Sequence, residues 1–428
     1  MKLYFTYLKP WIFFLAAFRF FMEGSEESFI APSAWFYIKS LGEDKVFLGI
    51  VLSAFPVAAV ISLPILGKIA DKYGNHRTII IACFALKVAS NVLYAVPISV
   101  YCPLFGRLFS GIAEGSAGVL NGKVVEYTSE LYRAKVFLIL DGLYTVGSLF
   151  APAVSAFLNF NANVLGWKIN AGNAPGIANA FLFSIFLFAS LCLPLEFGTQ
   201  KVLNYEADQG EWELTKISKK NFGSLSTVLM LYYLVFSAVF YSVTVTFFVP
   251  LLAQENFHLR MIHLQMLFLV SAIFWIVLIL SCYIASKYFD ARFLMAFSVL
   301  TQLAPMCLLA FIGFHWDSGM NTSGGYILIP YICLGAPYFA FALGSTLLSK
   351  ITNPKETSFY QGLLFSASHF GFVAGRITAP FMFHKNLILL YCGLLFLTWI
   401  AGAIWFAFEY KNLRSKTVMG KSMRRYIG

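Results

Sequence analysis

Twelve long apolar stretches separated by short polar loops make up most of the chain. Each stretch is close to the roughly 20 mostly apolar residues that an α-helix needs to cross the hydrocarbon core of a membrane. The pattern therefore predicts an all-α polytopic membrane protein with twelve transmembrane helices. We expect these helices at residues 11–38, 45–70, 78–98, 101–124, 134–159, 175–195, 224–252, 262–286, 292–313, 326–349, 358–383 and 387–409.

Two short sequences recur at corresponding places in the two halves of the chain. Ile69–Arg77 reads IADKYGNHR and Ile284–Arg292 reads IASKYFDAR, with the same Ile, Ala, Lys, Tyr and Arg. Gly147–Pro152 and Gly375–Pro380, in the fifth and eleventh expected helices, share Gly, Ala and Pro at matching positions. Duplication of a membrane bundle is typical of transporters.

The duplication predicts two pseudo-symmetric six-helix bundles, at residues 1–195 and 223–410. Residues 196–222 form a polar linker between them, and residues 411–428 form a basic tail. We interpret the linker as a connection on the cytosolic side that lets the two bundles move against each other.

Composition and charge agree with a membrane protein. Hydrophobic residues make up 59% of the chain and charged residues 12%, and the mean hydropathy is +0.74. If both termini are cytosolic, most of the 31 Lys and Arg residues lie on the cytosolic side, which is the positive-inside pattern. We therefore expect the net charge of +11 to meet membrane lipids and not nucleic acid.

The chain shows no pattern of an enzyme or of a cofactor site. Its seven cysteines include no CxxC pair, so neither a disulfide framework nor a metal site is predicted. Because no nucleophile–base pair and no phosphate-binding loop is visible, we expect no catalysis and no cofactor. We also expect the protein to be a monomer. The sequon at Asn321 falls in a loop expected on the non-cytosolic side, which predicts N-glycosylation.

The loop after the second expected helix reads Gly67-Lys-Ile-Ala-Asp71-Lys-Tyr-Gly74-Asn-His-Arg77. It resembles the loop signature of the major facilitator superfamily, and the resemblance implies a transporter that works by alternating access. The two glycines allow a close approach between helices and a tight turn. The aspartate can accept hydrogen bonds from backbone amides, or pair with basic groups, at the ends of neighbouring helices. We expect a gating loop at Gly67, Asp71, Gly74 and Arg77. The second copy has Ser286 and Phe289 in place of Asp71 and Gly74, so we expect a weaker latch there.

Two further motifs carry the same resemblance. Arg107 with Gly111 and Gly115, each four residues apart, is similar to the arginine motif of the fourth helix in that superfamily. Gly147 followed by Ala151-Pro152 is similar to its fifth-helix motif, although Ala151 stands where antiporters usually carry glycine. The direction of transport therefore does not follow from this motif.

Stretches of the N-terminal half resemble the lysosomal ceroid-lipofuscinosis group within the superfamily. These are Phe47–Gly49, Asn91–Ala95, Trp167–Asn170 and Ala174–Pro175. The resemblance implies an endosomal or lysosomal membrane, with the plasma membrane as the alternative, and transport of an anion such as chloride.

Four ionisable residues of the first helix, Arg19, Glu23, Glu26 and Glu27, fall within an arc of about 100°. Charges at this depth are costly unless they line a wet cavity or meet partners. Because clustered carboxylates repel each other, protonation of one of them is favoured, which is what a proton-coupling site requires. The alternative is a permanent latch in which Arg19 neutralises Glu23. Both interpretations stay open.

Basic and acidic residues also occur inside other helices. Arg107 and Glu114 share a face of the fourth helix. They form an internal pair, or Arg107 binds an anionic substrate or relays protons with Glu114 or with the glutamates of the first helix. Arg376 in the eleventh helix has no acidic neighbour within two turns, so we expect it to meet an anion or a glutamate of the first helix. For Lys87 we expect snorkelling or a local pair.

These patterns lead to one hypothesis. The chain is a transporter, proton-linked, for an anionic or amphipathic small solute. An anion channel or uniporter of the same fold is the closest alternative, and a receptor or scaffold that does not transport is the third.

Overall fold

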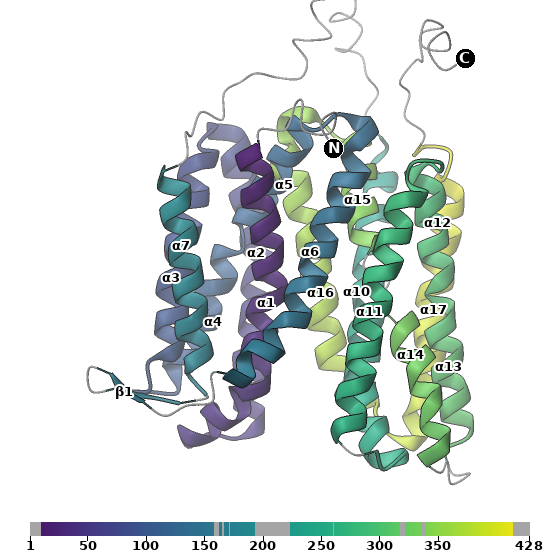
Figure 1. Cartoon of the computed structure of the whole chain (residues 1–428). Helices are drawn as coiled ribbons and strands as arrows, with labels where there is room; N and C mark the ends of the chain where they lie inside the picture. The colour runs from purple at the N-terminus through teal and green to yellow at the C-terminus, as the bar shows by residue number, and fades with distance from the viewer. Residues whose placement is uncertain are drawn as a thin grey trace, which may run out of the picture.

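The computed structural model describes residues 10–157, 162–164, 167–170, 172–192, 223–259, 261–316, 322–335 and 339–413. The predicted linker, Asn321 and the tail beyond residue 413 lie outside these residues. Figure 1 shows two groups of long, roughly parallel helices side by side. We call them the N-terminal bundle and the C-terminal bundle.

The N-terminal bundle consists of seven labelled helices and a short hairpin. The helices are α1 (Pro10–Ser40), α2 (Lys45–Tyr73), α3 (His76–Ala95), α4 (Tyr101–Ala113), α5 (Ser116–Tyr127), α6 (Glu130–Phe157) and α7 (Ala174–Cys192). The hairpin pairs β1 (Ala162–Val164) with β2 (Trp167–Ile169) in antiparallel register, Asn163 opposite Lys168. No strand was predicted here, because three-residue strands give no measurable alternation of apolar and polar positions.

The C-terminal bundle has the same helical character, with more interruptions. Its α-helices are α10 (Leu225–Leu251), α11 (Met261–Ala285), α12 (Ala291–Thr301), α13 (Leu303–Phe314), α14 (Leu328–Leu334), α15 (Phe339–Ile351), α16 (Thr357–Met382) and α17 (Lys385–Glu409). Short π and 3-10 turns accompany them: η2 (Leu252–Asn256), η3 (Thr322–Ile327) and η4 (Pro354–Glu356).

Three of the expected continuous helices are divided. The fourth is tightened at Glu114, where the amides of Glu114 and Gly115 bond to carbonyls three residues back, and it splits into α4 and α5. The ninth splits into α12 and α13, because Pro305 has no amide to bond the carbonyl of Thr301. In the tenth, α14 ends before Gly335 and α15 begins at Phe339, at a Gly-Ala-Pro sequence of the kind that breaks helices.

Apolar side chains cover the outside of the bundles. Eight stretches of helix in the described residues are long and apolar enough to cross a membrane, judged by length and composition alone. One face of α11 shows the pattern, because large apolar side chains stand exposed at three- to four-residue spacing: Met266, Leu269, Ile273, Val277, Leu280 and Ile284. Such a face suits lipid and not water.

The two bundles meet closely through α2, α5 and α6 on one side and α11, α15 and α16 on the other. In Figure 1, α16 lies between the bundles. A Cβ at Gly118 of α5 would lie 2.7 Å from the Cα of Gly362 in α16, which real structures do not tolerate. This close contact between backbones lies toward the end at which α2 and α5 finish, the predicted cytosolic end.

Candidate functional site

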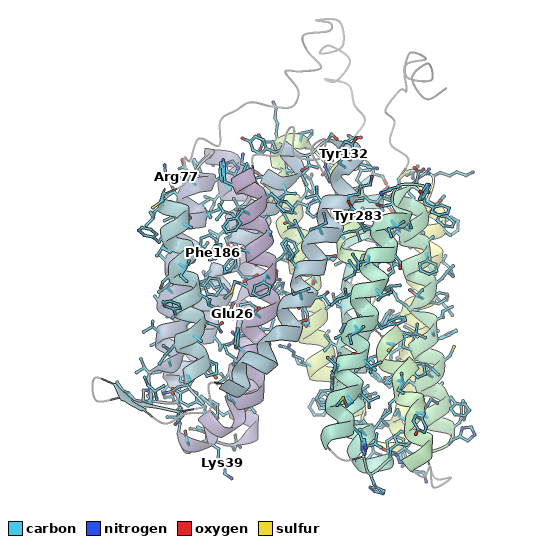
Figure 2. All side chains as sticks on the ribbon, viewed as in Figure 1. Glu26, Lys39, Arg77, Tyr132, Phe186 and Tyr283 are labelled. Carbon is cyan, nitrogen blue, oxygen red and sulfur yellow. The ribbon has the colours of Figure 1, made fainter. Side chains whose placement is uncertain are left out.

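Glu26, about midway along α1, is the centre of a buried polar network in the N-terminal bundle (Figure 2). Lys87 of α3 donates to its Oε2 at 2.6 Å, and Ser110 of α4 donates to its Oε1 at 2.6 Å. The Nη1 of Arg107 lies 3.4 Å from the same Oε1. Three helices are thus joined through one carboxylate.

Glu114 joins this network to the bundle interface. It forms ion pairs with Arg19 of α1 and with Lys87, whose Nζ lies 2.9 Å from its Oε2. Arg19 also donates to Glu23 at 2.7 Å, one helical turn away. The tight turn after α4 places the carboxylate between Arg19 of α1 and Lys87 of α3.

The network carries three positive and three negative charges when all its members are ionised. The members are Arg19, Lys87, Arg107, Glu23, Glu26 and Glu114. Buried charges are tolerated when they are paired in this way, because the transfer of an unpaired charge from water to the protein interior costs roughly several kcal/mol.

The structure brings together most of the charged residues singled out from the sequence, and Arg19 pairs with Glu23 as one of the two interpretations expected. Arg107 pairs with Glu26 and not with Glu114 in the described residues. Lys87 does not snorkel, because its ammonium is buried in the network, and it pairs with Glu26 and Glu114 from outside its own helix. Glu27 lies in α1, but its side chain is outside the described ones. Sequence spacing alone could not pair Lys87 with Glu26, which lies on another helix.

A partly open cavity lies between the bundles and is lined by both. The N-terminal bundle contributes two carboxylates, from Glu23 and Asp141. Aromatic rings line much of the rest: Phe20, Tyr144, Phe341, Phe365 and Phe372. Ser242 and Ser368 add hydroxyl groups. The cavity is therefore apolar with a few acidic and hydroxyl groups.

Asp141 of α6 is the acidic residue that the sequence analysis missed. Its side chain is 6% exposed, and its Oδ2 accepts a hydrogen bond from the amide of Ala342, in the first turn of α15, at 3.0 Å. Among the described residues, no basic side chain lies within ion-pair distance of it. The signal was present in the sequence, because Asp141 follows the apolar run Val136–Leu140.

The predicted gating loop contacts the other bundle. Asp71 accepts hydrogen bonds from the first-turn amides of α16, from Ser358 at 3.3 Å and from Phe359 at 2.7 Å. Gly74 ends α2 with a φ of 70°, a conformation that glycine adopts without strain. Arg77 lies exposed at the start of α3 (Figure 2).

The second copy of the loop makes different contacts. Ser286 donates to the carbonyl of Tyr283 at 2.7 Å, and the ring of Phe289 stacks on Phe293 at 5.0 Å. These contacts are local to the C-terminal bundle. The second copy has neither the carboxylate nor the second glycine of the first copy, and these local contacts are consistent with that loss.

Arg376 lies in α16, partly exposed, with its guanidinium carbon 5.4 Å from the ring centroid of Phe372. Phe372 lines the cavity, so Arg376 lies near the cavity wall. Its pairing with an anion or with a glutamate of the first helix stays a prediction.

Three possible metal-binding side chains approach one another across the bundle interface. The ligand atoms of Glu23, Glu114 and His369 lie within 4.8 Å of one another. Arg19 pairs with both carboxylates, and Lys87 pairs with Glu114. Because these cations already balance the carboxylates, the geometry favours an ion-pair network over a metal centre.

Comparisons with known proteins agree with the helical architecture. The family model described as Major Facilitator Superfamily matches residues 12–342. The class H tetracycline resistance protein of Pasteurella multocida is 25% identical over 365 residues, which are 84% of each chain. The solved structure of the proton:xylose symporter XylE is similar with a TM-score of 0.73 at 14% identity, covering 94% of this chain and 95% of that one. The human organic anion transporter MFSD10 is similar with a TM-score of 0.66 at 16% identity, covering 94% and 99%. These similarities confirm the predicted all-α, two-bundle membrane fold.

Proposed function

We propose a specific activity on the premise that this chain belongs to the major facilitator superfamily and is a secondary transporter. It moves an amphipathic small solute across a membrane by alternating access, and the movement is linked to protons. The observation that carries this proposal is the cavity between the bundles, because both bundles line it. A solute held there contacts both moving parts.

The described gate contacts support a conformation closed at the predicted cytosolic end. Asp71 holds the first turn of α16, and Gly67 of α2 lies directly against Ser358. To open that end, the bundles must separate at these contacts. Gly67, Asp71, Gly74 and Arg77 then serve as the gating loop, with Asp71 as the group that binds and releases.

Proton linkage is assigned to the cavity and not to the whole acidic face of α1. Glu26 and Glu114 are each paired with cations inside the N-terminal bundle, and Glu23 is paired with Arg19. Asp141 has an amide partner and no described cation. A carboxylate in the cavity wall that no described cation pairs with can bind and release a proton, so Asp141 is the group best suited to carry the proton.

The cavity wall supports the amphipathic part of the predicted solute class. Its carbon-rich lining suits an organic group, since ligand sites are usually apolar with a few placed polar groups. An inorganic anion would meet Glu23 and Asp141 in this cavity. Three arginines remain candidates for a role in the transport cycle: Arg19, Arg107 and Arg376.

The location of the protein stays part of the proposal. The resemblance in the N-terminal half supports an endosomal or lysosomal membrane, with the plasma membrane as the alternative. Microscopy of the tagged chain tests the location. Loss of a glycosidase-sensitive mass shift in Asn321→Gln tests the glycosylation, since removal of the sequon removes the acceptor.

Flux in reconstituted vesicles tests the activity. Radiolabelled amphipathic solutes are screened with an imposed pH gradient, in the native chain, in Asp141→Asn and in the exposed-loop control Asp290→Asn. We expect gradient-driven flux in the native chain and the control, and loss of the gradient dependence in Asp141→Asn. Flux that ignores the gradient in the native chain, or ionic current without coupled solute movement, contradicts the proposal.

A further inference from the structure

Three phenylalanine rings form one wall of the cavity. The rings of Phe341 and Phe365 lie 4.6 Å apart between centroids, and Phe20 lies 6.4 Å and 6.0 Å from them. These rings come from α1, α15 and α16, so both bundles contribute. Aromatic faces attract apolar groups and also cations, because the ring face carries partial negative charge.

The charges that line the cavity are negative. Glu23 and Asp141 are its acidic lining groups, and no Lys or Arg is among its described lining residues. Arg19 lies near, with its guanidinium carbon 5.9 Å from the ring centroid of Phe365, but it is paired with Glu23 and Glu114. Glu23 is therefore neutralised, whereas none of the described basic side chains pairs with Asp141.

The Asp141 carboxylate has acceptor capacity left after its bond to Ala342. The amide uses Oδ2, and a carboxylate offers about four lone-pair positions on its two oxygens. Asp141 is more than nine-tenths buried and lies in the wall of the cavity. An ammonium or similar group in the cavity can therefore contact Asp141 without displacing α15.

We infer that the cavity takes a cationic amphipathic organic solute, whose positive group binds Asp141 and whose apolar part packs on Phe20, Phe341 and Phe365. This inference rests on the proposed transport function and specifies its substrate class. It reverses the sign of charge expected from the sequence, because the arginines that suggested an anion are ion-paired or lie outside the cavity lining.

A proton and the cationic solute compete for Asp141, because protonation removes the negative charge that attracts the solute. Other titratable groups near Asp141 are Glu23 on α1, Tyr144 on α6 and Cys282 on α11, and α15 presents the amide of Ala342. Glu23 adds a second negative charge, although Arg19 offsets it, and His369 of α16 lies within 4.8 Å of the Glu23 carboxylate. Solute affinity is therefore higher at alkaline pH than at acidic pH.

The bond between Asp141 and Ala342 also crosses the bundle interface. Asp141 belongs to the N-terminal bundle, and Ala342 belongs to the C-terminal bundle. Binding of either a proton or the solute at Asp141 changes the charge of this acceptor. The same side chain thus connects occupancy of the cavity with the contact between the moving parts.

Two probes of like shape and opposite charge test the inference. Binding of labelled tetraphenylphosphonium and tetraphenylborate to the purified full chain is measured by equilibrium dialysis in detergent, and binding to protein-free micelles is subtracted. We expect saturable binding of the phosphonium at least about tenfold tighter than of the borate, which is a difference of one decade in dissociation constant. Equal or tighter borate binding overturns the inference.

Variants then assign the charge selectivity to Asp141. In Asp141→Asn we expect phosphonium affinity to fall at least about tenfold, while Asp141→Glu and the exposed-loop control Asp290→Asn keep it. Unchanged affinity in a monodisperse Asp141→Asn protein overturns the assignment. If that variant does not fold, the comparison of the two probes on the native chain still decides the charge class.

The pH dependence of phosphonium binding is a further readout. We expect the native chain to bind more weakly at about pH 5.5 than at about pH 8, and a native affinity that does not change overturns the competition. Binding needs no flux, so the two proposals fail separately. Phosphonium binding without gradient-driven flux contradicts the transport proposal alone, and flux with borate preference contradicts the cation site alone.

Discussion

The Oδ2 of Asp71 lies 2.7 Å from the backbone nitrogen of Phe359, across the interface between the two bundles. The amide belongs to the first turn of α16, where amide groups lack partners within the helix and the helix dipole favours a negative charge. One carboxylate of the repeated loop therefore holds a helix of the other half.

Replacing this carboxylate with an amide should open the gate. In Asp71→Asn we expect the ratio of closed to open molecules to fall about 10- to 100-fold, because a hydrogen bond to a charged group contributes about 1.5–3 kcal/mol. Spin labels at Tyr73→Cys and Lys355→Cys, both at exposed positions, report the separation in a background without other cysteines.

Asp290→Asn is the matched control for this experiment. Asp290 lies in the second copy of the loop, and its carboxylate is 75% exposed beside Arg292. Its loss should leave the distance distribution unchanged. An unchanged distribution in Asp71→Asn as well would remove Asp71 from the gate.

The close approach of α2 to α16 should be sensitive to a single methyl group. A Cβ at Gly67 would lie 2.9 Å from the carbonyl carbon of Ser358, so Gly67→Ala forces the backbones apart. Overpacking of this kind costs about 1–3 kcal/mol. We expect a larger mean distance between the same spin labels and a lower thermal stability of the closed state.

Gly49→Ala provides the comparison within the same helix. A Cβ at Gly49 meets nothing within 4 Å, so only the helix propensity changes. If both alanine variants behave alike, the contact at Gly67 does not determine the closed state.

The ion pair between Glu26 and Lys87 should stabilise the N-terminal bundle. Glu26→Gln leaves Lys87 paired with Glu114 alone, and Lys87→Gln leaves Glu26 with Arg107 as its remaining cation. We expect each change to cost at most about 3–5 kcal/mol, which is the cost of breaking a buried pair. The double variant should cost less than the sum of the two single variants. Thermal unfolding of the purified variants measures all three differences.

Asp290→Asn is the control for the ion-pair cycle. The Asp290 carboxylate is 75% exposed beside Arg292, so we expect a change within about 1 kcal/mol. Additive effects of Glu26→Gln and Lys87→Gln would mean that the two side chains do not stabilise each other.

The sequence predicted the helices well, because long apolar runs and a lipid solvent leave few other structures. The positions at which helices break were harder to predict from the sequence. The break in the tenth helix lies at a Gly-Ala-Pro sequence that is visible in the chain, whereas the carboxylate at the tightened turn of Glu114 pairs with Arg19 and Lys87 of other helices. Contacts between helices decide such local geometry, and they do not follow from a single span.

The candidate site was predicted in its residues but not in its pairing. Periodicity placed Arg19, Glu23 and Glu26 on one side of α1, but the depth and rotation of α3 decide that Lys87 reaches Glu26. Asp141 was missed although the same rule on ionisable residues in apolar helices applies to it. The role proposed for Asp141 depends on its place in the cavity wall, and the cavity forms only when both bundles pack together.

Variants at Arg133 and at its partner Ser349 should distinguish two roles of the Arg133 side chain, which are to stabilise the end of α5 and to hold the two bundles together. Its Nη2 donates to the carbonyls of Val125 and Thr128 at 3.0 Å, at the end of α5, and its Nη1 donates to Ser349 of α15 at 2.8 Å. Arg133→Met removes both roles, whereas Ser349→Ala removes only the bond between bundles. We expect Arg133→Met to lower thermal stability by about 3 kcal/mol or more, since each hydrogen bond from a charged group contributes about 1.5–3 kcal/mol. Ser349→Ala should mainly increase the distance between the spin labels, and an equal loss of stability in both variants would contradict this division.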